Sequence, residues 1–310
     1  MTGAPLSPSP APSPWRVHAL MLVAATLVST SFTVGKAITA YMDPALLTLV
    51  RFLLATLLFS PMAWQHRPLL PGDSIGKKLH SLLRYSMISG TISGFFYLMF
   101  LALRTTTSLN TGVIFTLLPG ISGIYAFFLL GQHLERGRLI ALILAMAGTL
   151  WVLFKGSLAL MLEMHLNRGD LIFFAGCLLM AFYSPLIKLL HRGESMTLMT
   201  FWVLVTGCGW LLVLAGPALT ATAWDAVPGT AWAGIAYLAV FSTIITFYIT
   251  QWATLHLGPT RVMAYSYLYP PLILLLDALS GKGLPSSQTL IGLLLLLPAM
   301  YFVQKGYEQE

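Results

Sequence analysis

The stretch FYLMFLALRTTTSLNTGVIFTLLPG, residues 96–120, decides the fold because the chain carries a second, diverged copy of it. A shift of 151 residues without a gap places Phe96-Tyr97 on Phe247-Tyr248, Ser108 on Pro259, Asn110 on Arg261 and Pro119-Gly120 on Pro270-Pro271. A proline inside a helix removes one hydrogen bond at a cost of about 3 kcal/mol. Two matching prolines therefore predict paired helix breaks, or hinges, beside a shared cavity. The alternative is that they have no special role, because membrane helices tolerate proline.

Composition predicts a membrane protein. The 310 residues are 57% hydrophobic and 9% charged, with a mean hydropathy of +0.81, whereas soluble domains have about 25% charged residues. The net charge of +7 could indicate a nucleic-acid partner, but the basic residues lie in short clusters between apolar runs. We therefore expect the lipid bilayer as partner and no nucleic acid. Cys177 and Cys208 lie in apolar runs without metal-ligand spacing, and we expect no metal and no cofactor.

The apolar runs predict an all-α membrane protein with ten transmembrane helices, because about 20 apolar residues cross a bilayer. The first five are expected at 15–37, 44–65, 84–103, 108–130 and 137–157, and the second five at 169–191, 196–216, 230–254, 259–280 and 286–305. The expected parts of the chain are a disordered tail (1–14), a first repeat (15–157), an inter-repeat loop (158–168), a second repeat (169–305) and a C-terminal tail (306–310).

The two repeats are expected to be inverted relative to each other. Five helices are an odd number, so the second repeat must enter the membrane from the opposite side. The run at 169–191 also matches the first run at an offset of 152, which argues against a cleaved signal peptide at residues 15–37. More Lys and Arg fall on the side of the amino terminus than on the other side. The positive-inside rule therefore predicts that both termini are cytoplasmic.

Two charges lie within the predicted helices, where even lenient insertion scales assign about 2.5–3.5 kcal/mol to a central Arg or Asp. Arg51 follows Pro44 by seven residues, about 10 Å into the membrane by helical rise. It is predicted either to contact an anionic group or to bond to a neighbouring helix in the bundle, and the second interpretation is favoured. Asp277 is either a proton-coupling residue or a solvated carboxylate near the outer mouth, and the solvated interpretation is favoured.

A polar stripe follows the ninth predicted helix. Arg261, Tyr265 and Tyr269 recur every fourth residue and therefore share one face. The tyrosines could stack against a planar ligand while the guanidinium meets a carboxylate. The alternative makes Arg261 a topology charge and the tyrosines part of an interfacial belt, although Tyr269 is too deep for such a belt.

Three motifs resemble the drug/metabolite transporter superfamily, specifically its ten-helix EamA-type carriers. They are DPALLTLVRFLLA (43–55), TTTSLNTGVIFTLLPG (105–120) and LHLGPTRVMAYSYLYPP (255–271), and the resemblance covers residues 15–305. One departure is that Gln132 follows Gly131 where the family usually has glutamate. Another is that Val28-Ser29 replaces a frequent Trp-Gly pair in the first helix.

The resemblance implies a central alternating-access cavity lined by helices 1, 3, 4, 6, 8 and 9. By position, the candidate substrate-binding residues are Ser31, Phe32, Tyr97, Asn110, Thr111, Phe115, Tyr183, Tyr248, Arg261, Tyr265 and Tyr269. It also implies an exporter in a bacterial inner membrane, with a small-molecule substrate. The sequence does not determine the oligomeric state, and we expect a monomer. The first predicted helix contains no acid, so a cationic drug would lack a carboxylate partner there. Amino acids, including aromatic ones, are the favoured substrates.

Two other classes of function were weighed. An intramembrane enzyme acting on a lipid-linked or phosphate-bearing substrate would need His, Asp or Glu grouped at catalytic spacing near one membrane face. A channel would need a ring of like charges or a filter motif. The sequence contains neither pattern, and we therefore expect a transporter rather than an enzyme.

Overall fold

The computed structural model describes residues 14–66, 74–131, 136–159, 167–257, 259–281, 283 and 286–305, and the regular structure in these ranges is helical throughout. The first half contains α1 (Pro14–Ile38), α2 (Pro44–Trp64), α3 (Ile75–Leu103), α4 (Ser108–Phe115), α5 (Leu118–Leu130) and α6 (Arg136–Leu153). The second half contains α8 (Arg168–Leu190), α9 (Met196–Ala221), η1 (Trp224–Ala226), α10 (Gly229–Ala239), η2 (Val240–Ile245), α11 (Thr246–Leu257), α12 (Pro259–Ala264), η3 (Tyr265–Leu268), α13 (Tyr269–Leu279) and α14 (Ser287–Lys305).

The predicted all-α membrane class is confirmed. Within the described ranges, eight helical segments are long and apolar enough to cross a membrane, and Leu139–Leu153 forms a shorter apolar helix. Large apolar side chains also cover the outer surface, among them Leu57 at 69% exposure and Val213 at 76%. Such a surface suits lipid, because soluble monomers rarely expose wide apolar patches.

Side chains at the helix starts explain several boundaries. Asp43 accepts hydrogen bonds from the backbone N–H groups of Ala45 and Leu46 at the start of α2, and Pro44 occupies the first helical turn. Ser74 caps α3 in the same way by accepting from Lys77 N. These caps satisfy N–H groups that lack a partner within the helix.

The helix α3 begins nine residues before its expected start at 84. Residues 75–80 are polar or exposed and extend the helix by about two turns. Hydropathy marks only the apolar part of a helix, so a hydrated extension capped by Ser74 is invisible to it. Of the predicted N-terminal tail (1–14), residues 1–13 lie outside the described residues, and Pro14 begins α1. Residues 160–166 of the predicted loop (158–168), the predicted C-terminal tail (306–310) and the side chain of Arg261 also lie outside them.

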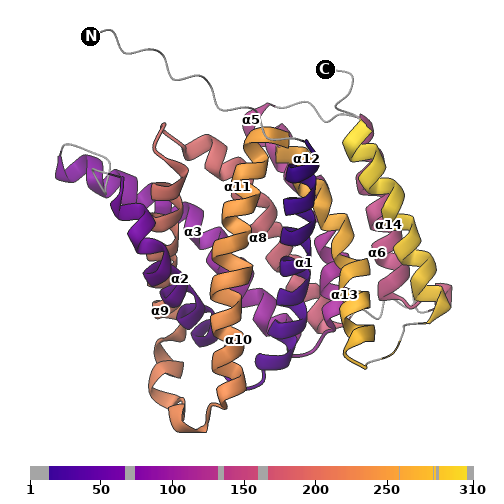
Figure 1. Cartoon of the computed structure of the whole chain (residues 1–310), viewed down its shortest axis with the longest axis horizontal. Helices are drawn as coiled ribbons and strands as arrows, with labels where there is room; N and C mark the ends of the chain where they lie inside the picture. The colour runs from indigo at the N-terminus through magenta and orange to yellow at the C-terminus, as the bar shows by residue number, and fades with distance from the viewer. Residues whose placement is uncertain are drawn as a thin grey trace.

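The helices form a bundle whose neighbours are distant in sequence (Figure 1). The helix α3 packs along α8 and α9, and α2 packs along α9 and α10. The pair α6 and α14 packs together at one end of the molecule. In Figure 1, α1 begins and α14 ends at the upper edge of the bundle.

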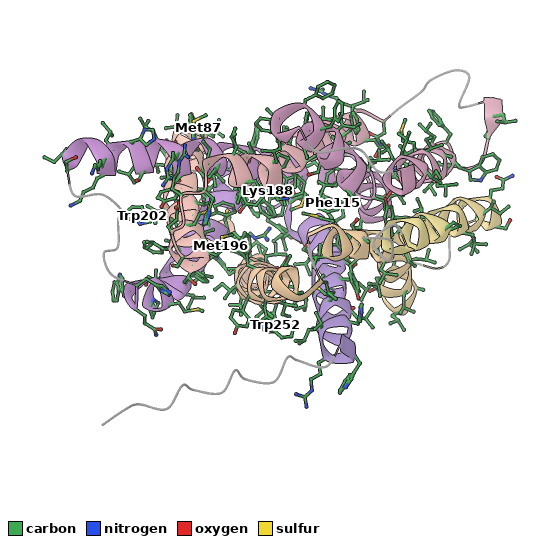
Figure 2. All side chains as sticks on the ribbon, turned by 90° about the horizontal axis from the view of Figure 1, so that it is seen from above. Met87, Phe115, Lys188, Met196, Trp202 and Trp252 are labelled. Carbon is green, nitrogen blue, oxygen red and sulfur yellow. The ribbon has the colours of Figure 1, made fainter. Side chains whose placement is uncertain are left out.

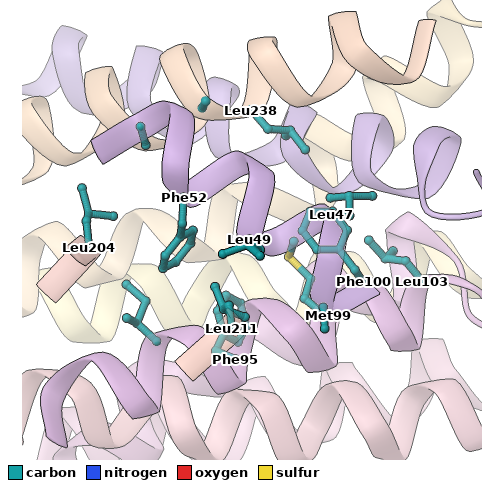
Figure 3. Close-up of a cluster of buried hydrophobic side chains, with 14 of the residues drawn as sticks. Leu47, Leu49, Phe52, Phe95, Met99, Phe100, Leu103, Leu204, Leu211 and Leu238 are labelled. Atoms are coloured by element: carbon teal, nitrogen blue, oxygen red, sulfur yellow. The ribbon is translucent and has the colours of Figure 1, made fainter. Parts of the chain in front are cut away.

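The main hydrophobic core lies where α2, α3 and α9 meet (Figure 3). Phe52, Phe100 and Leu103 have no exposed surface, and Leu211 of α9 lies in the same cluster. Close packing of such side chains contributes dispersion energy, which holds helices together within a membrane, where the hydrophobic effect does not act between them. The core therefore joins helices of both halves of the chain.

The fourth predicted helix is broken near its middle. The helix α4 ends at Phe115, and α5 begins at Leu118 with Pro119 in its first turn. Pro119 has no N–H to donate to Phe115, which is why the α-helical pattern cannot continue through this point. Thr116 bonds through both its backbone N–H and its hydroxyl to Val113 O.

The ninth predicted helix is broken at the corresponding place. The short helix α12 ends at Ala264, the 3-10 turn η3 covers Tyr265–Leu268, and α13 begins at Tyr269 immediately before Pro270 and Pro271. Both breaks therefore lie just before the prolines that coincide at the offset of 151 residues.

The two broken helices cross each other through a glycine. The helix α4 packs against α13, and α5 packs against α12, so the two rods run in opposite directions. At the crossing, a Cβ on Gly112 would collide with Ile273 Cδ1 and would lie 3.8 Å from Pro270 Cα. The side chain of Ile273 therefore fills the space beside Gly112, and a side chain at this position of α4 would have to displace it.

We expect Gly112→Leu to destabilise the protein by about 1–3 kcal/mol, because it overpacks the crossing. Gly209→Leu on α9 is the matched control, since nothing lies within 4 Å of a Cβ at that position. Thermal unfolding in detergent measures both variants. Equal melting temperatures for the two would show that the crossing tolerates a side chain.

A buried ion pair ties α3 to the loop between α8 and α9. Arg84 Nη2 lies 3.1 Å from Glu194 Oε1, and both side chains are nearly inaccessible. Arg84 Nη1 also donates to Leu190 O at 2.7 Å, and Tyr85 OH donates to Glu194 Oε1 at 3.3 Å. Burial raises the pKa of Glu194, but backbone hydrogen bonds from Glu194 and Arg192 and the charge of Arg84 outweigh it. The pKa of Glu194 therefore lies below its ordinary value of 4.5.

We expect Glu194→Gln to lower the free energy of unfolding at pH 7 by about 3–5 kcal/mol, because it leaves Arg84 buried without a countercharge. A lowered folded pKa means that the ionised carboxylate stabilises the protein above pH 4.5. This stabilisation is lost as the pH falls through the folded pKa. The melting temperatures of the two proteins should therefore differ from pH 7 to pH 4.5 and converge as the pH falls further below 4.5. A difference that stays constant down to the lowest pH at which both proteins remain folded would contradict this.

Candidate functional site

An aromatic cluster lies beside the crossing of the two broken helices. Phe32 of α1, Phe115 of α4 and Tyr269 of α13 contact one another, with ring centroids 5.5 to 6.4 Å apart. Phe115 lies in the middle of the bundle when it is viewed from above, whereas Met87 lies at its edge (Figure 2). Three elements that are distant in sequence thus bring their rings to one place, and we call these three residues the central aromatic cluster.

The cluster continues through α3 and α8. Phe95 lies 5.8 Å from Phe115 and 6.0 Å from Phe173, and Phe173 lies 5.9 Å from Phe32. Phe96 lies 5.0 Å from Phe95 by ring centroids. Aromatic pairs of this kind contribute about 0.5–1.5 kcal/mol beyond area burial. They form a continuous path of mostly buried rings that extends from the crossing toward α2.

Arg51 lies at the α2 end of this aromatic path. Its side chain is fully buried, and its Cζ lies 4.3 Å from the centroid of the Phe96 ring. Nε and Nη2 donate to Thr243 Oγ1 at 3.1 and 2.9 Å, and Nη2 lies 3.4 Å from Ser242 O. Nη1 has no hydrogen-bond partner among the described residues.

The partners of Arg51 belong to η2, a π-helical segment between α10 and α11. Thr243 Oγ1 also donates to Leu238 O, five residues earlier, at 2.9 Å. Short π-helical segments often occur at functional sites. Desolvation of a charge costs several kcal/mol, and a desolvated cation–π contact returns about 2 kcal/mol. The hydrogen bonds to Thr243 and Ser242 offset more of this cost, whereas the donors on Nη1 contribute nothing among the described residues.

A second polar group joins the start of α8 to the start of α4. Asp170 is buried and accepts hydrogen bonds from the Thr106 hydroxyl and from Asn110 Nδ2, the latter at 3.2 Å to each carboxylate oxygen. The amide of Asn110, a predicted substrate-binding residue, is thus bound to a neighbouring helix.

His18 occupies the position in the first half that corresponds to Asp170 at the offset of 152 residues. Its Nδ1 forms a hydrogen bond with Tyr265 OH in the ninth predicted helix. The same register position therefore joins the start of α1 to one broken helix and the start of α8 to the other. Tyr265 is also a predicted substrate-binding residue.

The structure brings together three of the predicted substrate-binding residues, namely those of the central aromatic cluster. Ser31 and Thr111 are buried and bond to backbone carbonyls of their own helices. Tyr183 is buried and Tyr97 half-buried in the main core. Tyr248 is 61% exposed on α11 and lies apart from the cluster.

The other predicted residues are placed as follows. Pro119 and Pro270 lie at the two helix breaks, and Pro271 follows Pro270 in α13. Asp277 is half-buried in the last turns of α13. No group of three His, Cys, Asp or Glu residues in the described ranges could hold a metal ion.

Sequence reasoning missed five residues that shape this region. They are His18, Phe95, Phe96, Asp170 and Phe173. Aligning the starts of the two repeats at the offset of 152 would have paired His18 with Asp170 as polar residues at equivalent positions. The phenylalanines give no such signal, because a membrane helix contains many apolar residues.

Comparison with known proteins supplies the family. The model of the EamA-like transporter family matches residues 15–154 and 167–304. The chain is 22% identical over 206 residues to "Uncharacterized transporter YyaM" of Bacillus subtilis (strain 168), covering 66% of this chain and 68% of that protein. It is 25% identical over 244 residues to "Uncharacterized transporter YetK" of the same organism, covering 79% and 72%.

The fold also has a solved counterpart. A crystal structure described only as that of a protein has a TM-score of 0.67 with this chain at 19% identity. The match covers 96% of this chain and 99% of the other. At this identity the likeness supports the arrangement of helices alone.

We expect Asp170→Ala to lower the free energy of unfolding by about 1–3 kcal/mol, because it leaves the Thr106 hydroxyl and the Asn110 amide without their acceptor. The control is Asp225→Ala, which removes an exposed acid and should change stability by less than about 0.5 kcal/mol. Thermal unfolding in detergent compares the two. Equal stability of the two variants would show that the hydrogen bonds of Asp170 do not help to hold α4 against α8.

Proposed function

Because the chain belongs to the EamA-like transporter family, we propose that it is a secondary transporter that exports small metabolites, with amino acids, including aromatic ones, as the favoured substrates. The family and the two relatives named as transporters make its class of activity transport rather than catalysis. The single observation that carries the substrate proposal is the central aromatic cluster at the crossing of the broken helices.

The proposed architecture is ten transmembrane helices in two inverted five-helix repeats. Helices occupy each of the ten predicted ranges, and the family model matches the chain twice, once in each half. The contacts between helices also have the same pattern in both halves. In the repeat, α1 corresponds to α8, α3 to α11 and α5 to α13. Just as α3 and α5 pack against α8, their counterparts α11 and α13 pack against α1.

The pairs that would lie on the axis between the repeats are in contact as well. The helix α2 packs against α9, and α6 packs against α14. The broken helices run antiparallel, with α4 against α13 and α5 against α12. Inverted repeats with interrupted helices at their interface are typical of transporters that bind substrate near the middle of the membrane.

The proposed mechanism is alternating access with Pro119, Pro270 and Pro271 as hinges. The breaks before these prolines lack a continuous pattern of i to i−4 hydrogen bonds, so the two halves of each rod can change their angle at a low cost. Asp170 and His18 hold the two rods at their amino-terminal halves through Asn110 and Tyr265. Release of one contact at a time would open one side of the bundle.

The proposed location is the inner membrane with both termini in the cytoplasm. The helix α1 begins and α14 ends at the same edge of the bundle in Figure 1, as an even number of crossings requires. Lys78, Arg84, Lys188 and Arg192 would lie on the same, cytoplasmic side, in agreement with the positive-inside rule. We propose that the protein acts as a monomer within the bilayer.

The residues of the central aromatic cluster favour a substrate that is not a cation. The helix α1 contains no Asp or Glu, and the rings of Phe32, Phe115 and Tyr269 offer apolar, polarisable surfaces. A planar side chain can pack on these rings, whereas a cation at this depth would need a carboxylate. An amino acid with an aromatic side chain satisfies this condition best.

We expect proteoliposomes containing the protein to take up labelled phenylalanine faster than empty vesicles. Tyr269→Leu should raise the half-saturating concentration about 2–10-fold, because it removes an aromatic contact worth about 0.5–1.5 kcal/mol. Tyr41→Leu is the matched control, since Tyr41 is 51% exposed in the turn after α1. Equal flux with and without protein would reject aromatic amino acids as substrates.

A further inference from the structure

We propose that Arg51 binds one small monovalent anionic group at Nη1, either the carboxylate of a transported solute or a free chloride ion. The carboxylate source rests on the proposed transport of amino acids, and the chloride source does not. The binding group is the fully buried guanidinium between α2, α3 and η2.

The guanidinium of Arg51 is a fully buried positive charge. The hydrogen-bond partners of Arg51 are the hydroxyl of Thr243 and the carbonyl of Ser242, and both are neutral. The buried guanidinium of Arg84, by contrast, is paired with the carboxylate of Glu194. Buried charges in proteins are normally paired, so the site of Arg51 lacks one negative charge.

The guanidinium of Arg51 also has hydrogen-bond donors without a partner among the described residues. A guanidinium has five N–H groups, and those on Nη1 have no partner in the described part of the chain. Arg104 differs, because it lies at an exposed turn and donates to Thr39 O and Met42 O. An unpartnered charged donor without solvent contact is the feature that calls for a ligand.

The guanidinium of Arg51 is covered on one face and bonded along one edge. The ring of Phe96 covers one face of the guanidinium at 4.3 Å, so an anion cannot bind on that face. The Nε and Nη2 edge is occupied by Thr243. The Nη1 group remains, and a carboxylate oxygen or a halide binds in the plane of a guanidinium at such a position. The NH2 group at Nη1 is a single donor group, and it therefore suits an anion with one negative charge better than a phosphate dianion.

Ring contacts connect Arg51 to the central aromatic cluster. Ring contacts run without interruption from Phe96 to Phe95, from Phe95 to Phe115 and from Phe115 to Tyr269. A solute with its carboxylate at Arg51 could therefore direct an aromatic side chain along rings that lead to the crossing. The charge and the aromatic surface together would select an amphiphilic anion or a zwitterion.

The experiment measures thermal stability of the detergent-purified full chain with three probes of similar size. They are phenylalanine, 3-phenylpropionate, which lacks the amine, and phenethylamine, which lacks the carboxylate. Each is titrated in gluconate and in chloride buffer, since a ligand that binds the folded state raises its stability. The proteins are the wild type, Arg51→Gln, Arg51→Lys and the control Arg104→Gln.

We expect the two carboxylates, but not phenethylamine, to stabilise the wild type in gluconate. Arg51→Gln should raise their apparent Kd at least 10-fold, Arg51→Lys less, and Arg104→Gln less than 2-fold. If chloride is the anion instead, chloride alone will raise the melting temperature of the wild type and not that of Arg51→Gln. If Arg51→Gln fails to fold, measurements on the wild type still test the anion site. Equal affinity of the wild type for phenethylamine and 3-phenylpropionate, together with no effect of chloride on its melting temperature, would overturn the proposal.

The outcome separates this proposal from the proposed function. Phenylalanine flux with the same concentration dependence in wild type and Arg51→Gln would overturn the anion site and leave transport intact. Chloride stabilisation that depends on Arg51, without flux of any amino acid, would support the anion site and reject the amino-acid substrates.

Discussion

A backbone N–H or C=O without a partner costs several kcal/mol in the hydrocarbon of a bilayer, and this constraint governs the arrangement of the whole bundle. The chain interrupts two of its candidate membrane-spanning segments, at Thr116-Leu117 and at η3. Such breaks are tolerated only where protein surrounds them. Thr116 is fully buried and Tyr267 almost so, which places both breaks inside the bundle. The remaining helices form the wall that separates these breaks from lipid.

Close packing at the breaks follows from small residues and from side chains that bond to the backbone. Gly112 leaves room for the side chain of Ile273 of α13. The Thr116 hydroxyl donates a hydrogen bond to the carbonyl of Val113. Asp170 and His18 then fix the amino-terminal half of each broken rod to the first helix of the opposite half. In the proposed alternating-access mechanism, these polar contacts break one at a time while the apolar core stays intact. A carrier needs this combination, because it must change shape without unfolding.

The sequence predicted the class of fold well because its two strongest signals are physical requirements. Apolar runs of about 20 residues mark crossings, and Pro119 and Pro270 mark the breaks because proline cannot donate the helical hydrogen bond. Phe32, Phe115 and Tyr269 were selected by position in the repeat and do meet in the structure. The exposed side of Tyr248 could not be predicted, since the π-helical segment η2 precedes it and changes the helical phase. Contacts between distant helices, such as Arg51 with Thr243, leave no periodic trace in the sequence.

The inverted relation of the two halves is the central claim, and side-specific labelling of cysteines tests it most directly. Ala40 and Arg192 are exposed and occupy equivalent positions at the offset of 152 residues. Each is replaced by cysteine in a protein lacking Cys177 and Cys208, and cells are treated with a membrane-impermeant maleimide. The account predicts that Ala40→Cys reacts in intact cells and that Arg192→Cys reacts only after the inner membrane is permeabilised. Labelling of both cysteines from the same side would contradict it.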